Sequence, residues 1–378
     1  MKIAIISPDY HSRGGVERVV QFLARGLTAR QHRVDVWCRN AEIEPIDTGI
    51  HFNKVNCLGR RGPFMLLSFA WQTAREVAIS SYDAVVTMGV ASLAPNTIIV
   101  ANSVHLHWYR QSRARLRPSQ LRWWLKILNP LHPIVIFLEK MQYRVGRYKQ
   151  IIAASQPIKN ELNNLYEIPL SDIEVLPNGA DIRKLVPDQA TRLAVRRELG
   201  LSDGDQLILF AANEFERKGL RQVVETLVRI PDPCLKLLVI SRADHKQFLE
   251  LTRELGLSQR VSFLPPTSDL HRYMWASDLF VMPTQYEAWS LAIVEAQAAG
   301  LPVITTRLGS ADTVIDDGLS GFLVDDPLDV SELTAAIQLW RASPNREAMS
   351  AAAIERARQF SWDNILDGLE NILRNTGR

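Results

Sequence analysis

The stretch YEAWSLAIVEAQAAGLPVITT, residues 286–306, indicates the fold of the half of the chain that contains it. Its apolar residues at positions 291, 294, 298 and 301 follow helical spacing, which predicts a helix that begins near Ser290. The run Pro302-Val303-Ile304-Thr305 that comes next predicts a buried strand. A helix that leads directly into a buried strand is typical of α/β domains.

The same stretch carries two carboxylates, of which Glu287 precedes the predicted helix and Glu295 lies inside it. The free N–H groups of the first helical turn, near Ser290, favour an anion such as the phosphate of a sugar donor. A carboxylate in so apolar a helix needs hydrogen-bond donors, and ribose hydroxyls would supply them to Glu295. The alternative is a surface acid and a partly buried acid that caps a helix or pairs with an arginine.

Length and composition favour a soluble enzyme with two domains. A chain of 378 residues is too long for one ordinary core, and its composition, 47% hydrophobic and 22% charged, does not suggest disorder. The opening run MKIAIISP reads as a strand and not as a signal peptide, and no apolar segment reaches the roughly 18 residues that cross a bilayer. We therefore expect a cytoplasmic protein. A net charge of +3 gives no reason to expect nucleic-acid binding, and three scattered cysteines argue against a disulfide framework or a zinc site.

Strand-like and helical runs alternate in two successive series. The first series contains the predicted strands Lys2–Ser7, Arg33–Cys38, Ala84–Met88, Thr97–Ala101 and Gln150–Ala154. The second starts at Leu207 and continues through the opening stretch. This order predicts an α/β fold of two doubly wound, Rossmann-like domains. We place the domains at residues 1–185 and 186–360, and expect a last helix, about residues 361–378, to pack back on the first domain.

In each series a predicted turn follows the first strand, at the strand end where such sheets bind ligands. Gly14 and Gly15 open the first helix, so backbone without Cβ can approach a phosphate there; an ordinary tight turn is the alternative. The spacing is not Gly-x-Gly-x-x-Gly, so a nicotinamide dinucleotide is not indicated. Arg217 and Lys218 can neutralise a diphosphate leaving group, although a solvent-facing basic pair is the alternative.

Two histidines, His105 and His107, come just after the predicted strand Thr97–Ala101 and can reach a cleft from a loop. Of the two, His105 has the better position to hydrogen-bond a sugar hydroxyl. Asp203-Gly204-Asp205 reads as a turn and not as a metal site. The chain has no Walker loop, no Gly-x-Ser-x-Gly elbow and no His-Glu-x-x-His helix, which disfavours kinases, serine hydrolases and zinc proteases.

The segment from Arg113 to Lys126 is basic and aromatic, with Trp123 and Trp124 among its arginines and no acidic residue. Such a segment suits an anionic membrane surface or a phosphorylated glycolipid. A solvated helix whose tryptophans enter the core explains it equally well, and the sequence leaves both interpretations open.

Taken together, the chain resembles the retaining glycosyltransferases of family four, which have the GT-B architecture of two Rossmann-like domains facing across a cleft. The resemblance covers nearly the whole chain, and it extends to glycosyltransferases of the lipopolysaccharide core and of polysaccharides. It rests on the motifs Gly14-Gly15-Val16-Glu17, Leu176-Pro177-Asn178-Gly179, Arg217-Lys218-Gly219, and the Glu-x7-Glu pair of Glu287 and Glu295 running into Ala299-Gly300-Leu301-Pro302-Val303.

The resemblance implies that the C-terminal domain binds a nucleotide-diphosphate sugar, with UDP as the expected nucleotide. Arg217 and Lys218 would contact the diphosphate, and backbone amides near Ser290 and Leu291 would help to hold phosphate. Glu295 would bind the ribose. The family commonly has Gly-Arg where this chain has Ala212-Asn213, so the diphosphate contacts are expected to differ in detail.

The resemblance also implies roles for residues around the transferred sugar. Glu287 would hold the donor sugar's hydroxyls, Gly15 would approach the phosphate from the N-terminal domain, and His105 matches a family histidine near the sugar. Retention in this family resembles front-face displacement, so no protein nucleophile, cofactor or metal is expected. The implied reaction moves a hexose, such as glucose from UDP-glucose, to a cell-envelope glycan such as lipopolysaccharide core or a polysaccharide precursor, at the inner face of the cytoplasmic membrane. A non-catalytic sugar-nucleotide-binding protein and a sugar-nucleotide epimerase are the alternatives.

Overall fold

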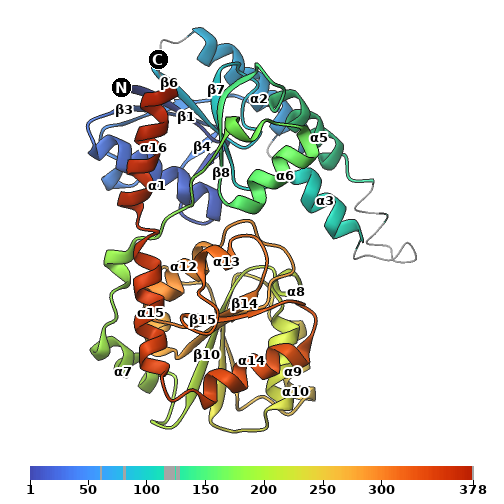
Figure 1. Ribbon diagram of the computed structural model, residues 1–378, viewed down its shortest axis with the longest axis vertical. Coiled ribbons are helices and arrows are strands. Elements are labelled where there is room, and N and C mark those ends of the chain that lie inside the picture. The colour runs from blue at the N-terminus through green and yellow to red at the C-terminus, as the bar shows by residue number, and fades with distance from the viewer. Residues whose placement is uncertain (60–61, 80–81, 115–123, 125–127, 377–378) are drawn as a thin grey trace. The chain divides into compact units, whose positions relative to one another are not determined.

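A computed structural model describes residues 1–59, 62–79, 82–114, 124 and 128–376 (Figure 1). The chain divides into two compact units, Met1–Asn178 with Trp362–Arg378 and Gly179–Ser361, called here the N-unit and the C-unit. The first division lies before residue 185, where the sequence analysis placed it. The reason is local, because Asn178 Nδ2 still donates to Asn102 Oδ1 of the N-unit at 2.9 Å, whereas Ala180 N donates to Phe360 O of the C-unit at 2.9 Å.

The N-unit is built on a parallel sheet of seven strands in the order β5-β3-β1-β6-β7-β8-β9. The strands are β1 (Lys2–Ile6), β3 (Arg33–Cys38), β5 (Ile50–Lys54), β6 (Ala84–Met88), β7 (Thr97–Ala101), β8 (Tyr148–Ala153) and β9 (Ile173–Val175). The inner strands β1 and β7 are buried over nearly their whole length, as expected for parallel strands covered on both faces. This burial explains why they read as continuous apolar runs.

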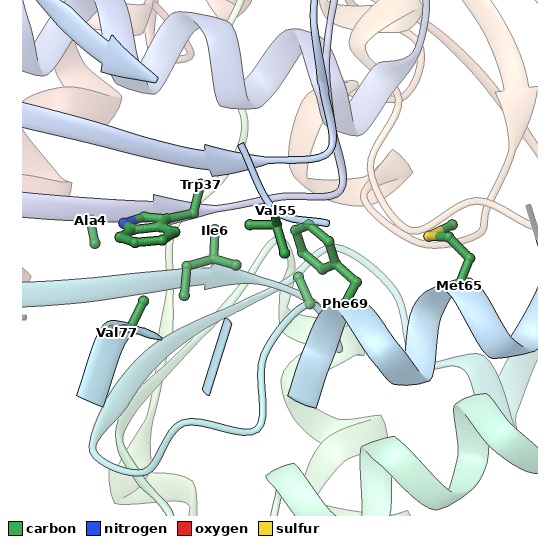
Figure 2. Close-up of a cluster of buried hydrophobic side chains, with 8 residues drawn as sticks. Ala4, Ile6, Trp37, Val55, Met65, Phe69 and Val77 are labelled. Carbon is green, nitrogen blue, oxygen red and sulfur yellow. The ribbon is translucent and has the colours of Figure 1, made fainter. Parts of the chain in front are cut away.

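Helices and short elements connect these strands. They are α1 (Gly15–Ala29), α2 (Pro63–Ile79), α3 (His105–Ala114), α5 (Leu131–Gln142), α6 (Gln156–Tyr166) and α16 (Trp362–Thr376), the paired strands β2 (Asp9–Tyr10) and β4 (Asn40–Ala41), and the 3₁₀ turns η1 (Pro45–Asp47) and η2 (Leu170–Asp172). One hydrophobic cluster joins strands β1 and β3 to α2. Figure 2 shows Ile6, Trp37 and Phe69 together in this cluster, which explains how the apolar face of α2 is covered.

The last helix, α16, lies along α1 in the N-unit (Figure 1). The ring of Phe22 stacks on that of Trp362 with centroids 4.7 Å apart. A Cβ at Gly26 would overlap with the side chain of Leu366, so glycine at this position lets the two helices approach closely. Helix α16 is therefore part of the N-unit core.

The C-unit contains a parallel sheet in the order β12-β11-β10-β13-β14-β15. The strands are β10 (Gln206–Ala211), β11 (Leu235–Ile240), β12 (Val261–Leu264), β13 (Leu279–Met282), β14 (Val303–Thr306) and β15 (Gly321–Val324). The connecting elements are η3 (Ile182–Leu185), α7 (Gln189–Glu198), α8 (Phe215–Lys218), α9 (Leu220–Arg229), α10 (Lys246–Glu254), α11 (Leu270–Ala276), α12 (Leu291–Ala298), α13 (Ala311–Val314), α14 (Val330–Ala342) and α15 (Arg346–Arg358).

Both sheets confirm the predicted fold class of two doubly wound, Rossmann-like units. In the C-unit the strand order reverses between β10 and β13, so the chain leaves these two neighbouring strands toward opposite faces of the sheet. A crevice at the carboxyl ends of such a strand pair is where open α/β sheets bind ligands. A ligand site is therefore expected at the loops after β10 and β13.

Candidate active site

The loops after β10 and β13 bring Lys218 and Glu287 into direct contact, with Lys218 Nζ paired to Glu287 Oε2. Lys218 ends α8, and Glu287 lies between β13 and α12. Both side chains are largely buried. Burial lowers the pKa of the Lys218 ammonium, and the Glu287 carboxylate opposes that change only in part. The pair is thus an ionic contact held in a poorly solvated position at the strand switch.

Arg217 lies beside this pair and is held by three hydrogen bonds. Its Nε and Nη2 donate to the two carboxylate oxygens of Glu214 at 2.9 and 2.6 Å, and its Nη1 donates to Tyr286 O at 2.6 Å. Burial alone would lower the pKa of the Arg217 guanidinium, but the contact with Glu214 holds it above its usual value. Arg217 is therefore a permanent cation that also links α8 to the loop carrying Glu287.

The start of α12 adds backbone donors to the same loop. Ser290 is the N-cap residue with extended backbone, its side chain makes no capping hydrogen bond, and the first turn contains no acidic residue. The amides from Leu291 onward therefore present partial positive charge without an internal carboxylate to neutralise it. Glu295 lies on the buried side of this helix, 8% exposed. The helix start and the position of Glu295 agree with the sequence prediction.

In the N-unit, Gly14 is the N-cap of α1 and Gly15 is its first residue. A Cβ at Gly15 would meet nothing within 4 Å, so packing inside the protein does not require glycine there. A Cβ at Gly14 would meet only the flexible side chain of Glu17. The predicted approach of Gly15 to a phosphate remains a prediction.

The structure corrects the placement of His105 and His107, which lie in the first turn of α3 and not on a loop. The reason is a tertiary cap: Glu139, buried on α5, accepts hydrogen bonds from His105 N at 2.7 Å and Leu106 N at 3.2 Å. His105 Nε2 lies 3.0 Å from His132 Nδ1. His107 Nε2 lies 3.6 Å from a carboxylate oxygen of Glu161. Both imidazoles thus have partners within the N-unit.

The structure thus unites the predicted residues Arg217, Lys218 and Glu287 at one strand switch, with Ser290 and Leu291 in the same connection. Gly14, Gly15 and His105 belong to the N-unit. Most of the predicted basic segment from Arg113 to Lys126 lies outside the described residues.

Sequence reasoning missed Glu214 and Glu139. Glu214 had no distinguishing signal. Glu139 did have one, because it is the only acidic residue between Ala101 and Gln150.

Comparison with known proteins agrees with this fold. Residues 13–184 match the family model "Glycosyltransferase Family 4", and residues 191–360 match "Glycosyl transferases group 1". A D-inositol 3-phosphate glycosyltransferase of Corynebacterium diphtheriae is 25% identical over 98% of this chain and 94% of its own length. The solved structure of WaaG, a glycosyltransferase involved in lipopolysaccharide biosynthesis, superposes with a TM-score of 0.82 at 20% identity, covering 98% of this chain and 99% of that one.

A second similar structure is that of Anabaena HepE in complex with UDP-glucose, with a TM-score of 0.77 at 17% identity over 99% of this chain and all of that one. The two family models together span nearly the whole chain, one on each unit. The chain therefore belongs to the GT-B glycosyltransferases of group 1 and family 4, and it is a glycosyltransferase.

Proposed function

We propose that this enzyme transfers a hexose, with retention, from a UDP-linked sugar to a hydroxyl group of a cell-envelope glycan such as lipopolysaccharide core or a polysaccharide precursor. The observation that carries the proposal is the contact of Lys218 with Glu287 beside Arg217 and the uncapped start of α12. Two cations and a row of amides suit a diphosphate. A carboxylate next to them suits the hydroxyl groups of the attached sugar.

In this reaction, these groups stabilise the leaving nucleoside diphosphate. The bond from the anomeric carbon to the phosphate oxygen breaks, and the bond to the acceptor oxygen forms on the same face of the sugar. The acceptor's proton passes to the departing phosphate oxygen. Lys218, Arg217 and the amides at Leu291 stabilise the negative charge that develops on the diphosphate. Glu287 positions the sugar, so no protein nucleophile is needed.

Donor binding must rearrange the pair that the structure shows. Lys218 is neutralised by Glu287, so a diphosphate that binds Lys218 replaces one anionic partner by another. Glu287 then becomes available to accept hydrogen bonds from the donor sugar. Because the fixed cations already supply positive charge, we expect transfer to continue at an unchanged rate in the presence of a metal chelator.

The charge distribution of the N-unit favours a phosphorylated acceptor. From Ala101 to Gln150 the chain has ten lysines and arginines against one acidic residue, Glu139. Glu139 is buried and already bound to the start of α3, so this stretch of the chain has no other acidic residue to offset its basic ones. Lipopolysaccharide core, phosphorylated lipid-linked precursors and D-inositol 3-phosphate all carry the anionic groups that such a surface would attract.

We further propose a peripheral contact with anionic lipid on the inner face of the cytoplasmic membrane. No helix in the described part of the chain is long and apolar enough to span a bilayer. Trp124, Leu128 and Phe137 are each more than half exposed within this basic region, and exposed apolar side chains among cations suit an anionic lipid surface. Co-sedimentation with phosphatidylglycerol vesicles tests the contact: Phe137→Ser should weaken it, whereas Leu339→Ser, at a similarly exposed position of the C-unit, should not.

The function is tested in two stages. A thermal-shift screen of nucleotide sugars identifies the donor, because a ligand that binds only the folded state raises the midpoint of unfolding. The donor is then incubated with lipopolysaccharide core, a lipid-linked precursor and D-inositol 3-phosphate, and nucleoside diphosphate release and the anomeric configuration are followed by NMR. A retained configuration in an acceptor-dependent product is expected. Binding without transfer to any acceptor, or a changed sugar without acceptor, contradicts the proposal.

A further inference from the structure

The loop of residues 283–288, called here the Glu287 loop, is bonded along its length to the segment that contains α8. Gln285 N donates to Arg217 O at 2.7 Å, and the side-chain amide Nε2 of Gln285 donates to Glu216 O at 2.8 Å. The guanidinium of Arg217 returns a hydrogen bond to Tyr286 O. The backbone on this side is therefore fixed by donors and acceptors that do not involve the Glu287 side chain.

The second contact of the Glu287 loop is with Gly309, which follows β14. Gly309 has φ +61°, and a Cβ at this position would overlap with the carbonyl group of Glu287. The atoms it would meet are backbone, so they cannot yield by a change of rotamer. Because β13 lies between β10 and β14 in the sheet, the Glu287 loop emerges between the α8 segment and the loop of Gly309.

The loop of Gly309 is itself anchored. Arg307 pairs with the carboxylates of Asp312, Asp317 and Asp325, at 2.7 Å for Asp317 and 3.1 Å for Asp325. The backbone N–H of Arg307 also donates to Val324 O at 2.8 Å on the edge strand β15. Gly309 therefore contacts the Glu287 loop from a segment that is itself hydrogen-bonded to the sheet.

We propose that Gln285 and Gly309 are positioning residues for Glu287. They hold its backbone in the position at which its carboxylate contacts Lys218. Neither residue touches the reacting atoms in this scheme. The inference rests on the proposed function of Glu287, and it adds that the catalytic geometry depends on the backbone contacts of the Glu287 loop. A misplacement of the order of 1 Å is enough to lower turnover about 100-fold.

The test compares Gly309→Ala with Gly200→Ala. Both glycines have positive φ, +61° and +66°, so both substitutions carry the same backbone strain, but a Cβ at Gly200 meets nothing within 4 Å. We expect kcat in Gly309→Ala to fall about 10- to 100-fold relative to Gly200→Ala, with the Kd for the free nucleoside diphosphate unchanged. Equal kcat values in the two variants overturn the inference, and so does a loss confined to nucleotide affinity.

A second variant and a second readout cover a failure of Gly309→Ala to fold. Gln285→Ala removes only the side-chain bond to Glu216 O, and Gln338→Ala on the exposed face of α14 is its control. Hydrogen–deuterium exchange of residues 284–290 should be faster in Gln285→Ala and Gly309→Ala than in their controls. This measurement needs no substrate, so unchanged exchange overturns the inference whether or not the enzyme is active. Absence of transfer by the wild-type enzyme contradicts the proposed function alone.

Discussion

Lys218 is subject to two opposing influences, because burial disfavours its charge while Glu287 favours it. The net effect lowers the pKa of its ammonium, so its positive charge is lost at a lower pH than that of an exposed lysine. We expect kcat/KM for the donor to fall on the alkaline side for this reason. In Lys218→Arg the guanidinium stays charged, and the alkaline fall should disappear. Identical alkaline limbs in pH–rate profiles of the two proteins would show that Lys218 does not titrate in catalysis.

Removal of the Lys218 ammonium group should strongly lower the catalytic efficiency. Lys218→Ala is expected to lower kcat/KM about 10²- to 10³-fold, the usual effect of losing one preorganised group that stabilises transition-state charge. Lys236→Ala, on β11 of the same sheet, removes a half-buried lysine that donates to Gln259 O at 3.2 Å, and it should stay within about twofold of wild type. Steady-state kinetics with varied donor and varied acceptor concentrations test this expectation. Wild-type turnover in Lys218→Ala would remove the residue from the mechanism.

Glu161 is expected to make the stability of the N-unit depend on pH. Burial, with a smaller contribution from the nearby Glu139, raises the pKa of the Glu161 carboxyl to about 7. The folded state therefore holds this proton more tightly than the unfolded chain, and the stability that the proton provides is lost as the pH rises from about 4.5 to about 7. Glu161→Gln should stabilise the protein by roughly 2 kcal/mol at pH 8 and leave it unchanged at pH 4. Denaturant unfolding at both pH values tests this, and an equal gain at both would contradict it.

The first turn of α12 can be tested through its backbone. Leu291 is the first residue of the helix and follows Ser290 in extended backbone, φ −104° and ψ 107°, so proline fits at position 291 without distortion. Leu291→Pro removes one amide donor and should weaken nucleoside diphosphate binding about 10-fold or more, in line with a hydrogen bond to a charged group. Leu291→Ala shortens the same side chain but keeps the amide. Calorimetry should find near-normal affinity in Leu291→Ala, and equal losses in both variants would exclude the amide as a ligand.

The sequence predicted the inner strands because burial on both faces makes them continuous apolar runs. The edge strands β5, β9 and β15 were missed, since all three are only partly buried and β9 and β15 are also short. The helical start at His105 was also missed, because α3 has no buried residue and its cap comes from Glu139, far along the chain. At the site, residue type and strand position predicted that Lys218 and Glu287 follow neighbouring strands, and the structure puts them in contact. Their roles stay predictions. The contact of Gly309 with the Glu287 backbone depends on tertiary packing that no local pattern encodes.

The two units should respond separately to perturbation. Leu369 on α16 is buried in the N-unit, and Leu369→Ala is expected to cost about 2–4 kcal/mol through the cavity it leaves. Nucleoside diphosphate, which we propose binds to the C-unit, should protect that unit by mass action. Hydrogen exchange is expected to show faster opening of α1 in Leu369→Ala and slower opening around α12 with the nucleotide. The reverse assignment, or protection of α1 alone by nucleotide, would contradict the division of roles.

The chain passes from the N-unit to the C-unit after Asn178 and returns after Ser361. Residues 179–361 are thus one uninterrupted segment between the two parts of the N-unit, and the fold defines both boundaries. If the C-unit binds the donor and the N-unit the acceptor, as proposed, exchange of this segment with that of a relative should change the donor specificity of the chimeric enzyme and leave its acceptor specificity unchanged.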